Sequence, residues 1–230
     1  MNIQRGSSFF MQNVSVNEYT GNLVDAYYMT QLIIDSSTFQ NLNLTSSIPF
    51  IRIRKLYGTY TGLTLKNLIF DNIYVKNSLF LVDNTLLQVT MTNITVTNLF
   101  KKSVTVKTAI EIDYESFWPG GIFFLGRNDI LLRMTNCTFY NIGSHCIGLN
   151  TAGLIITTSI FDNSGLNTEG LESATDQDDA SSGVTWINMY GGTSNVNYAQ
   201  QIVVTSNIFK DNKLMASRGG VRLTSFFDLF

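Results

Sequence analysis

Charged residues are scarce in this 230-residue chain, because Asp, Glu, Lys and Arg occupy only 14% of positions and the formal net charge is −2. A chain without a basic excess lacks the long-range field that attracts proteins to nucleic acid or anionic lipid. We therefore expect no nucleic-acid partner. The sequence also contains no run of about 18 apolar residues, the length that a membrane-spanning helix needs, and we expect no transmembrane segment in this chain.

Cysteine, histidine, proline and alanine are also rare. Two cysteines, Cys137 and Cys146, are too few for a disulfide framework, although a single bridge between them stays open. The only histidine, His145, cannot complete a zinc site with them, and we expect it in a turn. Two prolines and seven alanines exclude a collagen and a coiled coil. Asn, Thr, Ile and Ser are abundant instead, with 23, 25, 21 and 20 copies, which favours strands and turns over helices.

One short motif recurs along the whole chain, an apolar anchor followed two residues later by Asn or an acid. The anchors are Val16, Phe39, Phe70, Val96, Phe139, Phe161 and Phe209, and the residues that follow are Glu18, Asn41, Asn72, Asn98, Asn141, Asn163 and Asp211. The shortest anchor spacings, 22 and 23 residues, define the basic period. The longest, 43 and 48 residues, either hide a degenerate turn or carry a long loop.

A second apolar element precedes most anchors, in residues 48–53, 79–84, 120–126, 146–150 and 183–189. Alternating stretches such as 86–92 have the period of two that indicates a strand. A unit of this length cannot bury its own apolar face, but coaxial stacking buries each face against the next unit. We predict an all-β fold, a right-handed parallel β-helix of about 7–9 turns. It forms a single domain, residues 1–230, with loop excursions near 101–119 and 166–182.

The motif asparagines have a physical reason to lie at the corners between strands. Asn tolerates left-handed backbone geometry better than most residues, and its amide can bond to the equivalent amide one turn away. We expect a structural ladder inside the coil, where stacked amides satisfy one another. Its members are Asn41, Asn72, Asn98, Asn141 and Asn163. The Phe two residues earlier is expected to point into the core and stack on the Phe of the next turn.

These residues resemble a known fold family. Phe-x-Asn corners and Gly-Gly-apolar strands, at residues 120–123 and 219–221, are similar to the right-handed β-helix of the pectin-lyase-like superfamily. More narrowly, they are similar to the repeats of polymorphic outer-membrane and related surface proteins. The likeness extends over roughly residues 9–226, although those repeats have Phe-x-x-Asn at the corner. Enzymes of the superfamily imply either calcium-binding carboxylates with an Arg or Lys base, or paired Asp residues as general acid and base.

Two acidic clusters are candidates for such chemistry. Glu111 and Asp113 alternate along one strand, so both face one side and are candidates for an acid/base pair, or for a solvated outer row. Asp176, Asp178 and Asp179 lie in a Ser-rich segment and are candidates for calcium ligands, or for a solvated insertion. Calcium is the only cofactor that these residues suggest.

A small basic stripe is a further candidate for contact with a ligand. Arg52 and Arg54 are two residues apart and are expected on one strand face, either meeting an acidic glycan or solvated.

Residues 1–16 contain no signal peptide and residues 219–230 end in strand-like sequence, which suggests a section of a longer protein whose flanking sequence caps the solenoid. Four glycosylation sequons begin at Asn13, Asn43, Asn93 and Asn136, and they are compatible with an extracellular or cell-surface location.

Two functions from different classes remain. The regular repeat, without a convergent catalytic set, favours a non-catalytic surface or secreted β-solenoid that serves adhesion, glycan contact or structural display. Its partner would be a glycan or a cell-surface molecule. The alternative is a polysaccharide lyase or glycoside hydrolase acting on uronic-acid-containing polymers, an analogy that rests on the fold alone. Carboxylates and a base converging in one groove from adjacent turns would favour the enzyme.

Overall fold

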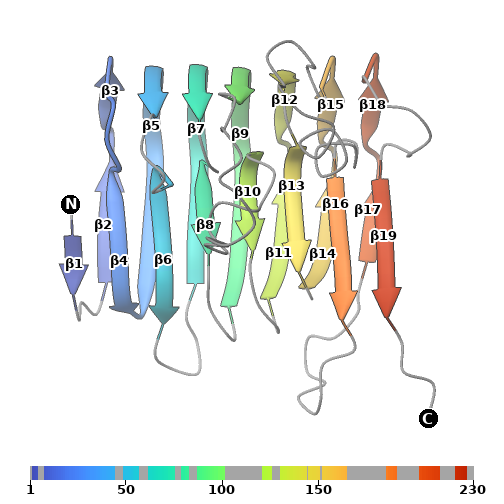
Figure 1. The fold of residues 1–230 in the computed structure, drawn as a ribbon, viewed down its shortest axis with the longest axis horizontal. Helices are drawn as coiled ribbons and strands as arrows, with labels where there is room; N and C mark the ends of the chain where they lie inside the picture. Colours follow the sequence, from blue (N-terminus) through green and yellow to red (C-terminus); the bar gives the residue numbers. More distant parts are fainter. Residues whose placement is uncertain are drawn as a thin grey trace, which may run out of the picture.

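The structure is a computed structural model, and its described residues form strands in two parallel sheets (Figure 1). It describes residues 2–4, 8–44, 49–56, 62–75, 79–82, 87–101, 121–125, 130–143, 145–150, 152–164, 185–190, 202–212 and 221–226. Regular structure in these ranges is strand only, so the predicted all-β class is confirmed. Within the same ranges, no helix has the length and hydropathy to cross a membrane.

In the described part of the chain, sheet A has eight strands and sheet B has eleven. In order across sheet A they are β1 (Asn2–Gln4), β4 (Val24–Met29), β6 (Ile51–Leu56), β8 (Phe80–Val82), β10 (Gly121–Leu125), β13 (His145–Asn150), β16 (Thr185–Tyr190) and β19 (Val221–Phe226). Sheet B contains β2 (Ser8–Gln12), β3 (Ser15–Asn17), β5 (Gln31–Leu44), β7 (Gly62–Val75), β9 (Leu87–Lys101), β11 (Ile130–Thr135), β12 (Thr138–Gly143), β14 (Ala152–Thr157), β15 (Ile160–Asp162), β17 (Ile202–Thr205) and β18 (Ile208–Lys210).

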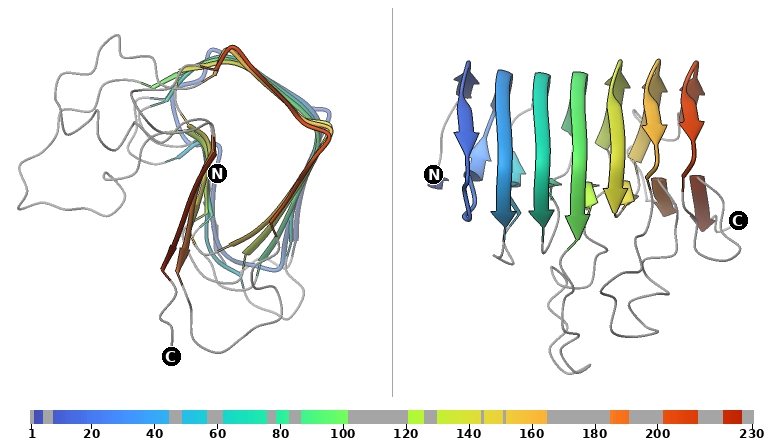
Figure 2. Two further views of the ribbon diagram at one scale, coloured as in Figure 1. Left: turned by 90° about the vertical axis from the view of Figure 1, so that its right-hand side faces the viewer. Right: turned by 90° about the horizontal axis from the view of Figure 1, so that it is seen from above.

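The chain alternates between the two sheets, so that each pass stacks on the one before it. β5 pairs in parallel with β2 and β3 on one side and with β7 on the other, and β9 continues the stack to β11 and β12. Viewed along the stack, successive passes nearly superpose (Figure 2, left). This arrangement of large parallel sheets is consistent with a β-solenoid, because each pass buries the apolar face of its neighbour.

The anchor residues lie directly above one another in sheet B. Phe139 pairs with Val96, and Phe209 pairs with Phe161, so neither long spacing hides an additional level of this sheet. The ring of Phe161 stacks on that of Phe139 at a centroid distance of 5.0 Å and an interplanar angle of 15°. The predicted column of stacked core phenylalanines is therefore present, and it joins Leu, Ile, Val and Met side chains in one continuous core. His145 is the first residue of β13, so its expected place in a turn is wrong.

Candidate functional site

The sequence suggested five acidic residues for catalysis or calcium binding. Glu111, Asp113, Asp176, Asp178 and Asp179 all lie outside the described residues. Among the residues that are described, no group of three or more His, Cys, Asp or Glu side chains could hold a metal ion.

Each described pass of sheet B contains two corners, five residues apart. The second corner holds the motif residues, and Asn41, Asn72, Asn98, Asn141 and Asn163 have φ between 45° and 55°. The left-handed conformation favours Asn at these positions, as the Phe-x-Asn spacing suggests. The first corner has the same conformation at Asn13, Ser36, Asn67, Asn93, Asn136, Thr158 and Ser206. Sequence reasoning missed this first series, although an Asn five residues before the second corner signals it.

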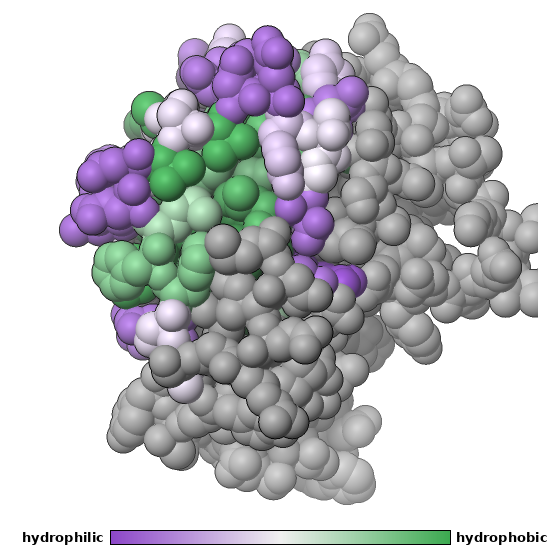
Figure 3. Space-filling view, turned by 90° about the vertical axis from the view of Figure 1, so that its left-hand side faces the viewer, coloured by the Kyte–Doolittle hydropathy of each residue, from purple (hydrophilic) through white to green (hydrophobic). Residues whose placement is uncertain are grey.

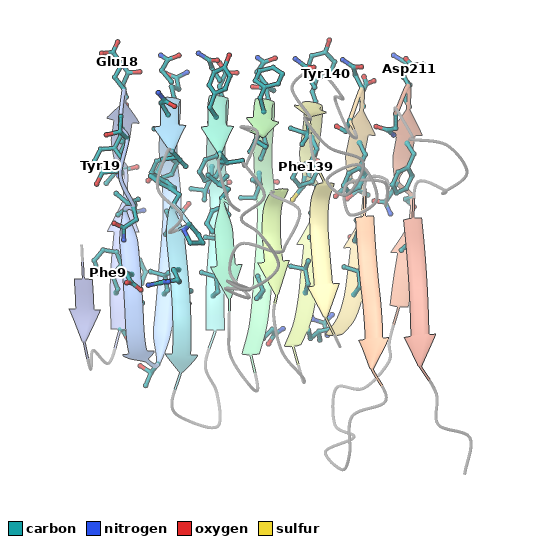
Figure 4. All side chains as sticks on the ribbon, in the orientation of Figure 1. Phe9, Glu18, Tyr19, Phe139, Tyr140 and Asp211 are labelled. Carbon is teal, nitrogen blue, oxygen red and sulfur yellow. The ribbon has the colours of Figure 1, made fainter. Side chains whose placement is uncertain are left out.

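The asparagine ladder lies on the outside of the stack, so the expectation of a ladder inside the coil is wrong. Asn41 and Asn72 are exposed, and the other three ladder asparagines are partly exposed. The reason is visible in β7, where the alternation breaks at each corner and two consecutive residues face outward. A corner side chain therefore points away from the core. Glu18, Tyr140 and Asp211 mark this edge in Figure 4, while Phe139 points inward.

In the second-corner ladder an asparagine usually donates to the asparagine of the neighbouring strand, but it donates to a carboxylate where that strand offers one. Asn72 donates through Nδ2 to Oδ1 of Asn41 at 2.6 Å, and Asn141 donates to Asn98 at 2.8 Å. Asn98, however, donates to Oδ1 of Asp71 at 3.0 Å, not to the equivalent Asn72. A carboxylate is a stronger acceptor than an amide oxygen, so the charge-assisted bond is preferred where the two compete.

The first corner carries a second ladder. Asn136 donates to Oδ1 of Asn93 at 2.7 Å, Asn93 donates to Asn67 at 2.9 Å, and Asn67 donates to Oδ1 of Asp35 at 2.9 Å. Three of the four sequons begin at first-corner residues, Asn13, Asn93 and Asn136. The corner geometry therefore gives the Asn of these three sequons a structural reason that is independent of glycosylation.

Small polar side chains point inward immediately after several corners and bond to the neighbouring backbone. The buried hydroxyl of Ser159 accepts from the backbone N–H of Cys137 at 3.1 Å. One level later, Asn207 accepts from the N–H of Ser159 at 2.8 Å and donates to the carbonyl of Ile156 at 2.9 Å. These side chains make hydrogen bonds to backbone groups where the corner interrupts the backbone hydrogen bonding between strands. Sequence alone does not distinguish these inward Ser and Asn side chains from the many Ser and Asn residues on the surface.

Arg52 is buried against Asp25 on the neighbouring strand, although it points away from the core. Its Nε and Nη2 atoms donate to the two carboxylate oxygens of Asp25, each at 3.2 Å, in a bidentate pair. The side chain of Arg52 is only 6% exposed, so the idea that it is solvated is wrong. β4 and β6 also shift register between Ala26 and Tyr27, where Ala26 pairs with Ile53 and Tyr27 with Lys55. The side chain of Arg54, expected on the same face as Arg52, is outside the described part of the structure.

Cys137 has a free, buried thiol. Burial raises the pKa of this thiol to about 11, so it is protonated at neutral pH and a poor nucleophile. Its Sγ atom lies 3.5 Å from the carbonyl oxygen of Thr135, to which it donates. Cys137 therefore acts as a small core residue.

Exposed aromatic rings and polar groups gather around the second corner of β7, β9 and β12. Tyr74 and Phe100 lie next to one another, with ring centroids 5.5 Å apart and planes tilted by 38°. On the other side of the corner Asp71, Thr97 and Tyr140 form one outward row, because Thr97 pairs with both of the others. Tyr74 and Tyr140 are 41% and 45% exposed. We call Asp71, Tyr74, Thr97, Phe100 and Tyr140 the corner platform.

Hydrogen bonds from neighbouring side chains favour the ionised form of two carboxylates. A hydrogen bond from the hydroxyl of Thr97, with a smaller contribution from Asn98, lowers the pKa of Asp71 below its ordinary value of 3.8. Hydrogen bonds from Asn67 and Ser36 lower the pKa of Asp35 in the same way. Both residues thus act as permanent acceptors near neutral pH.

Acidification is expected to weaken the fold through Asp71. Its folded-state pKa lies below the unfolded value, so its ladder bonds stabilise the protein above the ordinary pKa and that contribution is lost as pH falls through the folded pKa. Urea midpoints of the wild type and of Asp71→Asn, measured from about pH 6 to about pH 2.5, test this. The stability difference between the two proteins should narrow as the pH falls. Parallel curves would contradict the assignment.

No protein-family model, curated protein or solved structure matches this chain.

Proposed function

We propose that this chain is part of a right-handed parallel β-helix that acts as a non-catalytic contact surface, of the secreted or cell-surface kind, for glycans. The observation that carries the proposal is the corner platform. Exposed Tyr74 and Tyr140 and half-buried Phe100 surround a corner that bears hydrogen-bonding side chains. A glycan offers apolar ring faces to aromatic side chains and hydroxyl groups to polar ones, so such a surface suits it.

The electrostatics of Asp71 do not suit the role of a general acid. A general acid needs a raised pKa so that it carries a proton near neutral pH. The hydrogen bonds to Asp71 lower its pKa instead, and its Oδ1 atom is already shared between Thr97 at 2.6 Å and Asn98 at 3.0 Å. Asp71 is thus suited to fix the neighbouring side chains and to accept hydroxyl hydrogen bonds.

Removal of one platform ring is expected to weaken glycan binding about tenfold, because an aromatic stacking contact is lost while the fold is retained. The variants are Tyr74→Ala and Tyr140→Ala, measured by calorimetric titration against a panel of neutral and uronic-acid-containing polysaccharides. Phe10→Ala is the matched control, since Phe10 is 64% exposed but lies on β2, away from the corner platform. Equal losses for all three variants, or no binding by the wild type to any polysaccharide, would contradict the proposal.

A further inference from the structure

The fourth sequon, Asn43-Leu44-Thr45, lacks the structural reason that the corners give to the other three. Asn43 lies on β5, two residues after the second corner at Asn41, and is not among the residues with left-handed φ. Its side chain is exposed between the buried Leu42 and Leu44. Figure 3 views the end of the stack near the N-terminus and shows the same division, an apolar area bordered by hydrophilic residues.

The side-chain amide of Asn43 makes no hydrogen bond in the described part of the structure, whereas the amides of two corner sequons do. Asn136 donates through Nδ2 to Asn93 at 2.7 Å, and Asn93 donates to Asn67 at 2.9 Å. A sugar on Nδ2 replaces one of its two hydrogen atoms and adds bulk beside the ladder. A glycan would therefore disturb the ladder at either corner, but it would break no described hydrogen bond at Asn43.

The strand register places Asn43 beside an exposed aromatic ring. Asn43 pairs with Tyr74, and Tyr74 pairs with Phe100, so the three residues form one outward row across β5, β7 and β9. Phe100 contacts the ring of Tyr74 from one side of the row. The neighbour of Tyr74 on the other side is Asn43, at the strand spacing of about 4.8 Å. Because Tyr74 is 41% exposed, a sugar joined to Asn43 comes within reach of an uncovered part of this ring.

We propose that Asn43 is an N-glycosylation site, and that the first sugar of its glycan packs against Tyr74. Because such sites are modified on secreted chains, this site rests on the secreted or cell-surface part of the proposed function. The donor is an oligosaccharide joined through C1 of its first sugar to a lipid diphosphate. A bond forms between Nδ2 of Asn43 and C1 while the bond from C1 to the diphosphate oxygen breaks. The diphosphate leaves with that electron pair, Nδ2 loses one proton to a base, and nothing is oxidised or reduced.

Peptide mapping by mass spectrometry of the whole chain, secreted from eukaryotic cells behind a cleavable leader, tests the site. We expect the Asn43 peptide to carry a glycan, at a higher occupancy than the peptides of Asn93 and Asn136. Thr45→Ala removes the sequon without a change at Asn43 and should abolish this modification, whereas Thr45→Ser, the matched control, should retain it. An unmodified Asn43, or an occupancy no higher than that at Asn136, would overturn the site.

Unfolding of the secreted chain in urea tests the contact with Tyr74. Thr45→Ala should lower the ratio of folded to unfolded protein about fivefold more in the wild type than in a Tyr74→Ala background, because only the wild type loses a sugar–aromatic contact. Any direct effect of position 45 is common to both backgrounds and cancels. Equal effects in the two backgrounds would reject the contact. Polysaccharide titration of unglycosylated chain from bacteria tests the proposed function separately, so failure of that function is distinguishable from failure at Asn43.

Discussion

Replacement of Phe70 by alanine is expected to lower the free energy of unfolding by about 3–5 kcal/mol, because a truncated buried Phe leaves a cavity that neighbouring strands only partly fill. Phe70 is fully buried in the middle of the stack. Its ring stacks on Phe39 at a centroid distance of 4.8 Å and meets the edge of Phe80 at 5.6 Å. The substitution therefore weakens the contacts of β7 with β5 and with β8.

Urea denaturation followed by circular dichroism measures this loss. Phe10→Ala removes a ring of the same size from a position that is 64% exposed, and its effect is expected to stay within about 0.5 kcal/mol. If the two variants lost equal stability, the stacked aromatic column would not be the core of this fold.

The second large effect is expected at a corner. Asn93 has a φ of 55°, accepts a hydrogen bond from Asn136 at 2.7 Å and donates one to Asn67 at 2.9 Å. Asn93→Ala loses both bonds and forces a residue with a Cβ but no local polar group into the left-handed conformation. We expect a loss of about 2–3 kcal/mol, since the backbone strain and the bonds each contribute about 1 kcal/mol or more.

Asn93→Gly separates these two causes. Glycine adopts the left-handed conformation without strain, so this variant loses only the side-chain hydrogen bonds, and we expect about half the loss seen for alanine. Equilibrium unfolding of the two variants under one set of conditions gives the comparison. A glycine variant that is as unstable as the alanine variant would show that corner geometry is not what selects Asn at position 93.

The overall plan could be predicted because it follows from one repeated pattern. Anchors such as Phe39 and Phe161 recur two residues before a corner, and the alternation between them marks strands, so parallel stacking was the arrangement that buried every unit. The left-handed corners at Asn72 and Asn141 could be predicted for the same reason, since few residues other than Gly and Asn tolerate that backbone. The position of each anchor is enough to locate its corner, because the corner residue follows the anchor by two positions.

The outward direction of the ladder could not be predicted from spacing alone. At each corner two consecutive residues face outward, which moves Asn72 from the core side to the surface. The bond from Asn98 to Asp71 joins neighbouring strands, β9 and β7, and only the strand register brings these two residues together. The pairing of Arg52 with Asp25 likewise joins residues 27 positions apart. The corner platform could not be predicted because only strand register brings Tyr74 beside Phe100 and Tyr140 beside Thr97.

The measurement that tests the central claim most directly is an assay for new chain ends on polysaccharides. The folded, β-rich chain would be incubated with a panel that includes uronic-acid-containing polymers, with and without calcium, and new reducing or unsaturated ends would be measured. A non-catalytic contact surface predicts no release above the buffer control on any substrate. Sustained release that depends on calcium would contradict the proposed function and identify the chain as a carbohydrate-active enzyme.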